Sequence, residues 1–422
     1  MPGGDMVKII NTQSTFGQGY VYGNPQMTHW KAAYRKNTNF AMIPRIITNM
    51  NTGPSFDTEV IYTLSKDNSD LLYKVHLDAT LPAPATGLYT SFPGEKLIEY
   101  AELLIEGVSI SGRLTSDFLH CWHELSIPEE HKWTYRELVG NKNTGIRESN
   151  SFSISIPIPF WFTKNPGVSL PLCSLMNNSV QIIIKYQATN KMVRNENPAS
   201  SSIGTITGSL SNVNLYGTFI YLDQDERLRF QNNRMDYIIE QVQTETSTID
   251  TTVNFNFDHH VKELIWFATR NTFVNFNEHF KYTSSHDGAA TGTTWKQSSL
   301  GSHQNEEQVY PENTNTEDIT IGTCQLKFDS SNLFSDGAKN TRYFTHLQPF
   351  YHHTSVPWTP GIFVYSFALK PEEYQPSGMF DMSKIETQQI VFDSTTNYDN
   401  LTIMAVNYNV LIIANGIGKL AL

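Results

Sequence analysis

The densest group of side chains that could do chemistry in this sequence is the run HCWHEL, from His120 to Leu125. On a helical turn His120, His123 and Glu124 would lie close together, and imidazole and carboxylate groups both bind zinc. Zinc catalysis, however, usually needs two histidines at helical spacing with a further ligand, and the His-Glu-x-x-His order is absent. We therefore interpret the run as a helix that packs on a sandwich, and we predict no metal site.

Two histidine pairs and an acidic loop are the other candidates for ligands. His259-His260 and His352-His353 would point to opposite faces of a strand, so neither pair could hold one ion. The loop KPEEYQPSG (370–378) carries two carboxylates, but its prolines and glycine indicate a rigid crossover between sheets. No Gly-x-Ser-x-Gly elbow, Walker loop, Rossmann fingerprint or EF-hand sequence occurs. We predict no catalytic residue and no cofactor, and we expect that the protein is not an enzyme.

The charge balance and the cysteines limit the partners and the compartment. The net charge of −11 argues against a protein that grips phosphates, because that needs clustered Lys and Arg. We therefore expect no direct contact with nucleic acid. Three scattered cysteines suggest packing roles in a reducing compartment rather than a disulfide framework. No segment approaches the roughly 20 apolar residues that span a bilayer, and no signal-like run opens the sequence, so we expect a soluble, unsecreted chain.

The elements that would position these residues are short strands. Length favours two domains of about 200 residues, and the 12% of aromatic residues suit half-buried, pleated surfaces. Runs of β-branched and aromatic residues are broken by Gly, Pro, Asn, Asp and Ser, with few helical stretches. The predicted strands of the first half are 39–49, 56–65, 71–81, 98–111, 152–162, 180–187 and 212–223. Those of the second half are 237–246, 251–257, 261–270, 319–329, 361–369, 387–394 and 401–414.

The two lists match in order and character, which indicates a tandem repeat. Phe162 and Leu369, which end the two aromatic strands, are 207 positions apart, and Ile182 and Ile390 in the following strands are 208 apart. Many strands without helices between them favour antiparallel sandwiches. We therefore predict an all-β fold of two tandem eight-stranded antiparallel jelly rolls, with short helices in the loops.

The aromatic strand SISIPIPFWF shows how such a sandwich would be filled. Alternate positions point inward, and we expect these to be Ile154, Ile156, Ile158, Phe160 and Phe162. The intervening prolines and Trp161 would then share the opposite face. Because proline has no N–H donor, these prolines suit the edge of a sheet.

Six longer stretches of the sequence carry a recognisable pattern: GNPQMTHWKAAYRKNTNF (23–40), IPIPFWFTKNPGVSLPL (156–172), YLDQDERLRF (221–230), DYIIEQVQ (236–243), YSFALKPEEYQPSG (365–378) and AVNYNVLIIANGIGKLA (405–421). Together they resemble the major capsid proteins of nucleocytoplasmic large DNA viruses, the group of chlorella viruses, iridoviruses and mimivirus relatives. The resemblance implies a double jelly roll, three copies of which form a pseudo-hexagonal capsomer. Many capsomers would tile an icosahedral shell in the virion, assembled in the host cytoplasm over an inner membrane.

The resemblance and the charge pattern together suggest three regions. Residues 1–36 would form a basic N-terminal segment with a short amphipathic helix, residues 37–224 a first jelly roll, and residues 225–422 a second. No acid occurs between Met6 and Phe56, and Met27, Trp30 and Tyr34 form an apolar stripe at helical spacing. This segment would contact minor capsid proteins or the inner membrane surface, or else pack under its own jelly roll.

Three long loops are candidates for clasping neighbouring copies: 82–97, 188–211 and 271–318. The last is polar and carries seven acids and two lysines, so we expect it outside, at the top of the capsomer. The expected partners are other copies of the chain, minor capsid proteins and penton proteins. A rival interpretation, based on the aromatics and the acidic loops, is a two-sandwich carbohydrate-binding or glycan-processing protein.

Overall fold

The computed structural model describes residues 37–49, 53–65, 69–141, 151–194, 204–275, 277–283, 319, 321–393 and 398–421. Residues 40–422 form one compact unit. The predicted basic segment 1–36 lies outside the described residues, so its amphipathic helix stays a prediction. Within the described part of the chain, no helix is long and apolar enough to cross a membrane.

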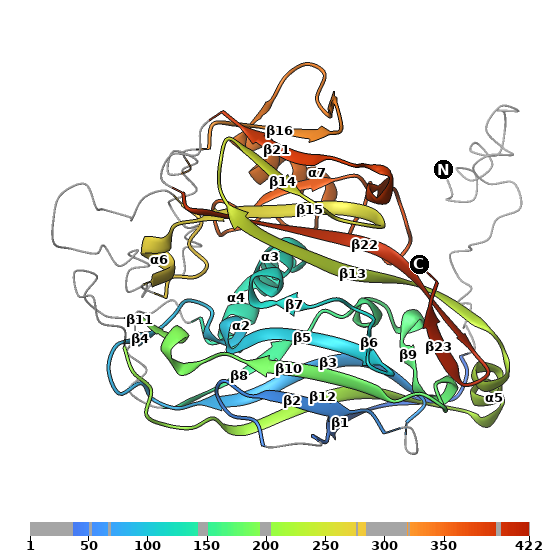
Figure 1. Ribbon diagram of the computed structural model, residues 1–422. Helices are drawn as coiled ribbons and strands as arrows, with labels where there is room; N and C mark the ends of the chain where they lie inside the picture. The colour runs from blue at the N-terminus through green and yellow to red at the C-terminus, as the bar shows by residue number, and fades with distance from the viewer. Residues whose placement is uncertain are drawn as a thin grey trace, which may run out of the picture. The chain divides into compact units, whose positions relative to one another are not determined.

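The first half forms two four-stranded antiparallel sheets with short additions (Figure 1). One sheet has the order β1 (Phe40–Ile47), β12 (Ser211–Leu222), β3 (Leu71–Leu81) and β8 (Phe152–Pro157), with β9 (Leu170–Pro171) on β3. The other has the order β2 (Glu59–Thr63), β10 (Val180–Tyr186), β5 (Ile98–Ile105) and β6 (Val108–Ser109), with β7 (Leu114–Thr115) on β5. A separate ribbon joins β4 (Leu88–Tyr89) to β11 (Val193–Arg194).

The second half repeats this plan. Its first sheet has the order β13 (Met235–Thr248), β22 (Asn400–Ala414), β15 (His260–Thr269) and β19 (Phe363–Ser366), with β20 (Phe380–Asp381) on β15 and β23 (Ile417–Leu420) on β22. Its second sheet has the order β14 (Thr252–Phe255), β21 (Gln388–Phe392), β16 (Thr323–Phe328) and β17 (Ser331–Asn332), with β18 (Lys339–Asn340) on β16.

Both halves therefore use the same strand order, in which the first strand pairs with the last and the last pairs with the third. In the second sheets, β10 lies between β2 and β5 and β21 lies between the equivalent strands β14 and β16, and they carry the fully buried Ile182 and Ile390. The predicted all-β fold of two tandem jelly rolls is confirmed. Phe162 and Leu369, which are 207 residues apart, are less clearly equivalent, because Phe162 is buried whereas Leu369 is exposed and follows β19.

Short helices fill the connections between strands, as predicted. The α-helices of the described residues are α2 (Pro93–Leu97), α3 (Ser116–Ser126), α4 (Glu129–Leu138), α5 (Gln224–Asn232), α6 (Asn271–Asn275) and α7 (Gln348–His352). The 3₁₀ turns are η2 (Trp161–Thr163), η3 (Pro166–Val168), η4 (Leu172–Ser174), η5 (Thr189–Lys191) and η8 (Met382–Lys384), and η7 (Tyr343–Leu347) is a π-helical turn that leads into α7.

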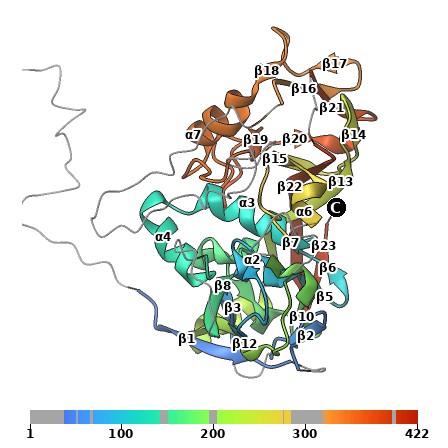
Figure 2. The same ribbon diagram turned by 90° about the vertical axis from the view of Figure 1, so that its left-hand side faces the viewer.

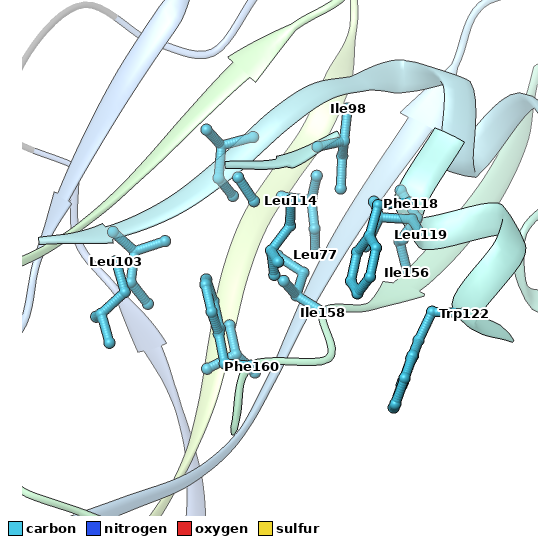
Figure 3. Packing of buried hydrophobic residues seen from close by; sticks show 14 of the residues in the cluster. Leu77, Ile98, Leu103, Leu114, Phe118, Leu119, Trp122, Ile156, Ile158 and Phe160 are labelled. Atoms are coloured by element: carbon cyan, nitrogen blue, oxygen red, sulfur yellow. The ribbon is translucent and has the colours of Figure 1, made fainter. Parts of the chain in front are cut away.

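The interior of the first sandwich follows from the alternation of side chains along its strands. In β8, and in β3 from Val75 onward, every second residue is buried, and the apolar residues at these positions point toward the facing sheet and α3 (Figure 3). The five residues predicted to point inward, from Ile154 to Phe162, are all at most 2% exposed. The strand lies at the edge of its sheet, as its prolines predicted.

The predicted extent of this aromatic strand was wrong. β8 ends at Pro157, and the chain turns through η2, so Trp161 does not lie on an outer face of the sheet. Trp161 is 5% exposed and packs against Tyr237 of the second jelly roll, with ring centroids 5.9 Å apart. The consecutive aromatic residues therefore fill two spaces: the core of the first sandwich and the junction with the second.

Candidate assembly interface between the two jelly rolls

Helix α3 carries the HCWHEL run and is fixed at both ends. Thr115 caps it, because its Oγ1 accepts a hydrogen bond from the amide of Phe118, and Asp117 lies in the first turn, where the helix dipole favours an acid. His120, His123 and Glu124 are all buried. The prediction of a packed helix is therefore correct, and the three polar side chains must find partners in the interior.

Glu95 of α2 supplies the partner for both histidines. Its Oε2 lies 2.7 Å from Nδ1 of His120, and its Oε1 lies 3.3 Å from Nδ1 of His123 and accepts from the hydroxyl of Tyr135 in α4. Burial by itself would raise the pKa of Glu95, but the charge of His120 and hydrogen bonds from both histidines lower it to about 2. The network joins α2, α3 and α4. It engages the Nδ1 atoms of both histidines and the Glu95 carboxylate, which are the kinds of group that would bind a metal.

A segment of the second half, residues 355–359, runs along α3 and α4. His120 Nε2 lies 3.1 Å from Oγ1 of Thr359, so the same imidazole bonds to both halves of the chain. The amide of Trp358 donates to Glu124 over 2.7 Å, and Lys132 donates to the carbonyl of Val356 over 2.8 Å. Arg136 lies above the ring of Trp358, 4.6 Å from its centroid.

A second charged group joins the two jelly rolls. Glu240 of β13 binds Lys164, which follows η2, at 2.5 Å and Lys262 of β15 at 2.8 Å. The Trp122 ring of α3 lies 4.6 Å from the Lys164 ammonium and 5.3 Å from that of Lys262. Burial lowers the pKa of Lys164 to about 8 in spite of Glu240, whereas for Lys262 the two glutamates Glu240 and Glu263 outweigh burial and raise the pKa.

The backbone edge of β13 also bonds to the first jelly roll. The amide of Val242 donates to the carbonyl of Ser111 over 3.0 Å, and Gly112 forms a parallel bridge with Val242. Gly112 has φ +70°, and a Cβ at this position would lie 2.2 Å from the Val242 carbonyl oxygen. A glycine is therefore required where the two jelly rolls touch.

Neither histidine pair lies wholly in a strand, as the strand argument assumed, because β15 begins at His260 and His259 precedes it with φ +67°. His352 ends α7, and His353 follows it with an extended backbone, so this pair is not in a strand. The His353 ring is buried between two carboxylates, with Nε2 3.2 Å from Glu263 and Nδ1 3.0 Å from Glu372. Glu372 belongs to the KPEEYQPSG loop, and this ion pair holds that loop against β15.

The three loops predicted to clasp neighbouring copies contact one another within the chain. The Asn277 side chain donates to the carbonyls of Asn190 and Val193 at 2.7 Å, and its own carbonyl accepts from Thr90 at 2.6 Å. Phe280 stacks on His120 at 4.3 Å between ring centroids. The expectation of an outer loop is therefore wrong for residues 277–283, most of which are buried, whereas in α6 only Phe273 is buried, and residues 284–318 lie outside the described part.

The side chains at this junction hold the two jelly rolls together through hydrogen bonds and ion pairs. In the part of the chain that the structure describes, no three His, Cys, Asp or Glu side chains gather as metal ligands, and the three cysteines are buried and unpaired. The buried charges of Glu95, Lys164, Glu240 and Lys262 are paired across element boundaries, so loss of one partner would leave a buried charge uncompensated. Sequence reasoning identified α3 but missed Glu95, Lys164, Glu240 and Lys262, because nothing local marks residues that meet only in the fold.

Two jelly rolls of identical strand order, joined through a buried face in one chain, define the class of double jelly-roll proteins. The first half, residues 28–223, matches the family "Major capsid protein N-terminus", and residues 226–419 match "Large eukaryotic DNA virus major capsid protein". The chain is 32% identical to the major capsid protein of Pyramimonas orientalis virus, with 95% of each chain covered. It is 28% identical to that of Paramecium bursaria Chlorella virus 1, over 95% of this chain and 96% of the relative.

Solved structures agree with this assignment. The capsid model of the PBCV-1 virus matches with a TM-score of 0.78 and 26% identity, covering 94% of this chain and 100% of that chain. The Faustovirus major capsid protein shares the fold, with a TM-score of 0.69 at 10% identity, over 97% of this chain and 94% of that one. The chain belongs to the major capsid protein family of large eukaryotic DNA viruses.

Proposed function

We propose that three copies of this chain form a pseudo-hexagonal capsomer and that many capsomers tile an icosahedral capsid. The observation that supports this most directly is the repeated strand order of the two jelly rolls and the buried junction that holds them together. Three copies of two similar units produce a ring with nearly six-fold edges, and such edges can tile a shell. The function is geometric and needs no catalysis.

The other expected partners belong to the same proposal. Minor capsid proteins and penton proteins would meet the capsomer in the shell of the virion, with assembly in the host cytoplasm. Residues 1–36 would face minor proteins or the inner membrane surface, and no direct contact with nucleic acid is expected. The division into a first jelly roll at 37–224 and a second at 225–422 also stays a prediction.

The alternative of a carbohydrate-binding or glycan-processing protein receives no support from the relatives, which are capsid proteins. The test is the oligomeric state of the purified full-length chain. Light scattering after size exclusion should give a trimer, and negative-stain microscopy should show hexagonal plates. A stable monomer at virion-like ionic strength that binds glycans would contradict the proposal.

A further inference from the structure

The strand β22 extends beyond its neighbour β15 in the second jelly roll. Its pairing with β15 stops at Tyr408, whereas its pairing with β13 continues to Ile413, and past Tyr408 the place of β15 is taken by β23. In Figure 2, β23 lies beside β5 and β6, which belong to the first jelly roll. The hairpin of β22 and β23 therefore reaches out of the second jelly roll and contacts the first.

Two consecutive asparagines of the first jelly roll hold the turn of this hairpin. The amide of Asn177 donates to the carbonyl of Gly416 over 3.0 Å, and its side chain donates to the carbonyl of Asn415 over 3.2 Å. The side-chain oxygen of Asn178 accepts from the amide of Gly418 over 2.7 Å, across 240 positions of the sequence. Asn178 is buried, so its amide group depends on this contact for a partner.

The loop that carries these asparagines is joined in turn to the connection between β5 and β6. The amide of Glu106 donates to the carbonyl of Ser179 over 2.9 Å, and the amide of Ser179 donates to the Glu106 carboxylate. Residues 105–108 and 175–179 thus form one bonded unit at an end of the first jelly roll, and we call them the base loops. The hairpin of β22 and β23 is bonded to this unit.

Apolar side chains fill the space between the hairpin and the base loops. Ile105, Leu175 and Leu411 are at most 2% exposed and belong to the cluster that fills the first sandwich. All three converge on Gly418, where an added Cβ would lie 2.8 Å from Cδ2 of Leu175, 3.6 Å from Leu411 and 3.7 Å from Ile105. A larger residue at this position would push the hairpin away from the first jelly roll.

We propose that the hairpin of β22 and β23 is a strap that closes the base loops of the first jelly roll, and that a chain can assemble only when the strap is in place. Residues 411–420 follow the other described strands of the second jelly roll in the sequence. A chain whose second half is absent or unfolded therefore cannot complete its first jelly roll, and the strap excludes such a chain from assembly. The part of this inference that concerns assembly rests on the proposed function, whereas closure of the base loops is measured on the single chain.

Amide hydrogen exchange of the full-length chain, followed by mass spectrometry, tests the closure. Gly418→Val should speed exchange in peptides that cover the base loops by about tenfold or more, because the strap no longer seats, and should leave β15 unchanged. Lys419→Val is the matched control, since Lys419 is exposed and the same side chain added there meets solvent. Exchange that rises only within residues 411–420, with the base loops as slow as in the unsubstituted chain, would overturn the inference.

A milder pair of variants covers the case in which Gly418→Val fails to fold. Asn178→Ala removes the acceptor of the Gly418 amide and should also speed exchange in the base loops, whereas Asn178→Asp keeps an acceptor oxygen and should restore slow exchange. Equal exchange in the two Asn178 variants and the unsubstituted chain would show that the hydrogen bond does not hold the strap, and would contradict the inference.

Light scattering across a dilution series tests the link to assembly. If most molecules of Gly418→Val have open base loops, only the closed fraction can associate, so the trimer should dissociate at a concentration about tenfold higher or more. A variant with open base loops whose trimer is as tight as that of the unsubstituted chain would overturn the assembly part of the inference and leave the proposed function standing. Absence of any trimer from the unsubstituted chain would overturn the proposed function, while the exchange experiment would still decide whether the strap closes the base loops.

Discussion

His353 is a buried imidazole whose two nitrogens each face a carboxylate. Burial by itself would lower its pKa, but the hydrogen bonds and charges of Glu263 and Glu372 raise it to about 9. Glu263 lies on β15 and Glu372 in the loop 370–378, so the protonated ring joins a strand to a loop. Removing either carboxylate would leave the remaining charges poorly compensated.

The raised pKa of His353 predicts a pH dependence of stability. The pKa rises from its ordinary value of 6.5 to about 9 on folding, so the contribution is complete below pH 6.5 and is lost as pH increases toward 9. The free energy of unfolding, measured in urea, should therefore fall across this interval. His353→Gln should remove that part of the pH dependence, while His131→Gln, at an exposed position, should retain it. An identical pH profile for His353→Gln and the unsubstituted chain would contradict the prediction.

The sequence predicted the helix that carries His120 and His123, but it did not predict the partners of the buried histidines. The His120–His123 spacing correctly indicated a helix, because that inference needs only local periodicity. Their partner Glu95 is 25 residues away from His120, and the ring of Phe280 comes from the other jelly roll. The environment of His353 was missed because the argument considered only how neighbouring side chains would point in a strand, whereas His353 follows the end of α7.

At the scale of elements, the strands were largely predictable and the junctions were not. Strands β3 and β22 lie almost where the pattern of apolar and β-branched residues placed them, because β3 buries one face and β22 buries both faces over most of its length. The turn at η2 was not predicted, since Trp161 and Phe162 suit a strand equally well. The ribbon of β4 and β11 was also missed, because each strand has two residues and no periodicity.

The junction of Lys164, Glu240 and Lys262 predicts the effect of one substitution on the contact between elements. Glu240→Gln would leave two buried ammonium groups without their shared carboxylate, and should lower the free energy of unfolding by about 3–5 kcal/mol. Replacing all three residues together by methionine removes the charges as a set and should cost far less, because no buried charge is left unpaired. Urea unfolding of both variants measures the difference.

A triple variant less stable than Glu240→Gln would show that the ion pairs stabilise the junction beyond their mutual compensation. Lys370→Met provides the control, since Lys370 pairs with Glu373 at the surface and its loss should cost at most about 1 kcal/mol.

At the scale of the whole molecule, the core does not stop at the boundary between the jelly rolls. The larger cluster of buried apolar residues includes the interior of the first sandwich together with residues of the second, among them Ile265, Val364, Met404 and Val406. A second cluster fills the interior of the second sandwich. Because one cluster spans both halves, separating the halves would expose apolar surface that is dry in the intact chain.

This continuity predicts that the described unit unfolds cooperatively. Far-UV circular dichroism and tryptophan fluorescence should give one coincident urea transition for the monomeric chain. Met404→Ala, at a fully buried position in the shared cluster, should cost about 2–5 kcal/mol and shift both signals together. Two separate transitions, or a shift in only one signal, would show that the jelly rolls unfold independently.

Joining two jelly rolls in one polypeptide changes the kinetics of closing a ring. If six separate jelly rolls had to meet, every one of the six contacts would depend on collision and would be weakened by dilution. In the proposed capsomer, synthesis of the chain itself establishes alternate contacts, at the high local concentration that covalent connection gives. Gly112 allows the backbone of the first jelly roll to approach Val242 of the second, so this contact forms within the single chain before it meets another copy. Two further chains are then enough to complete the proposed ring.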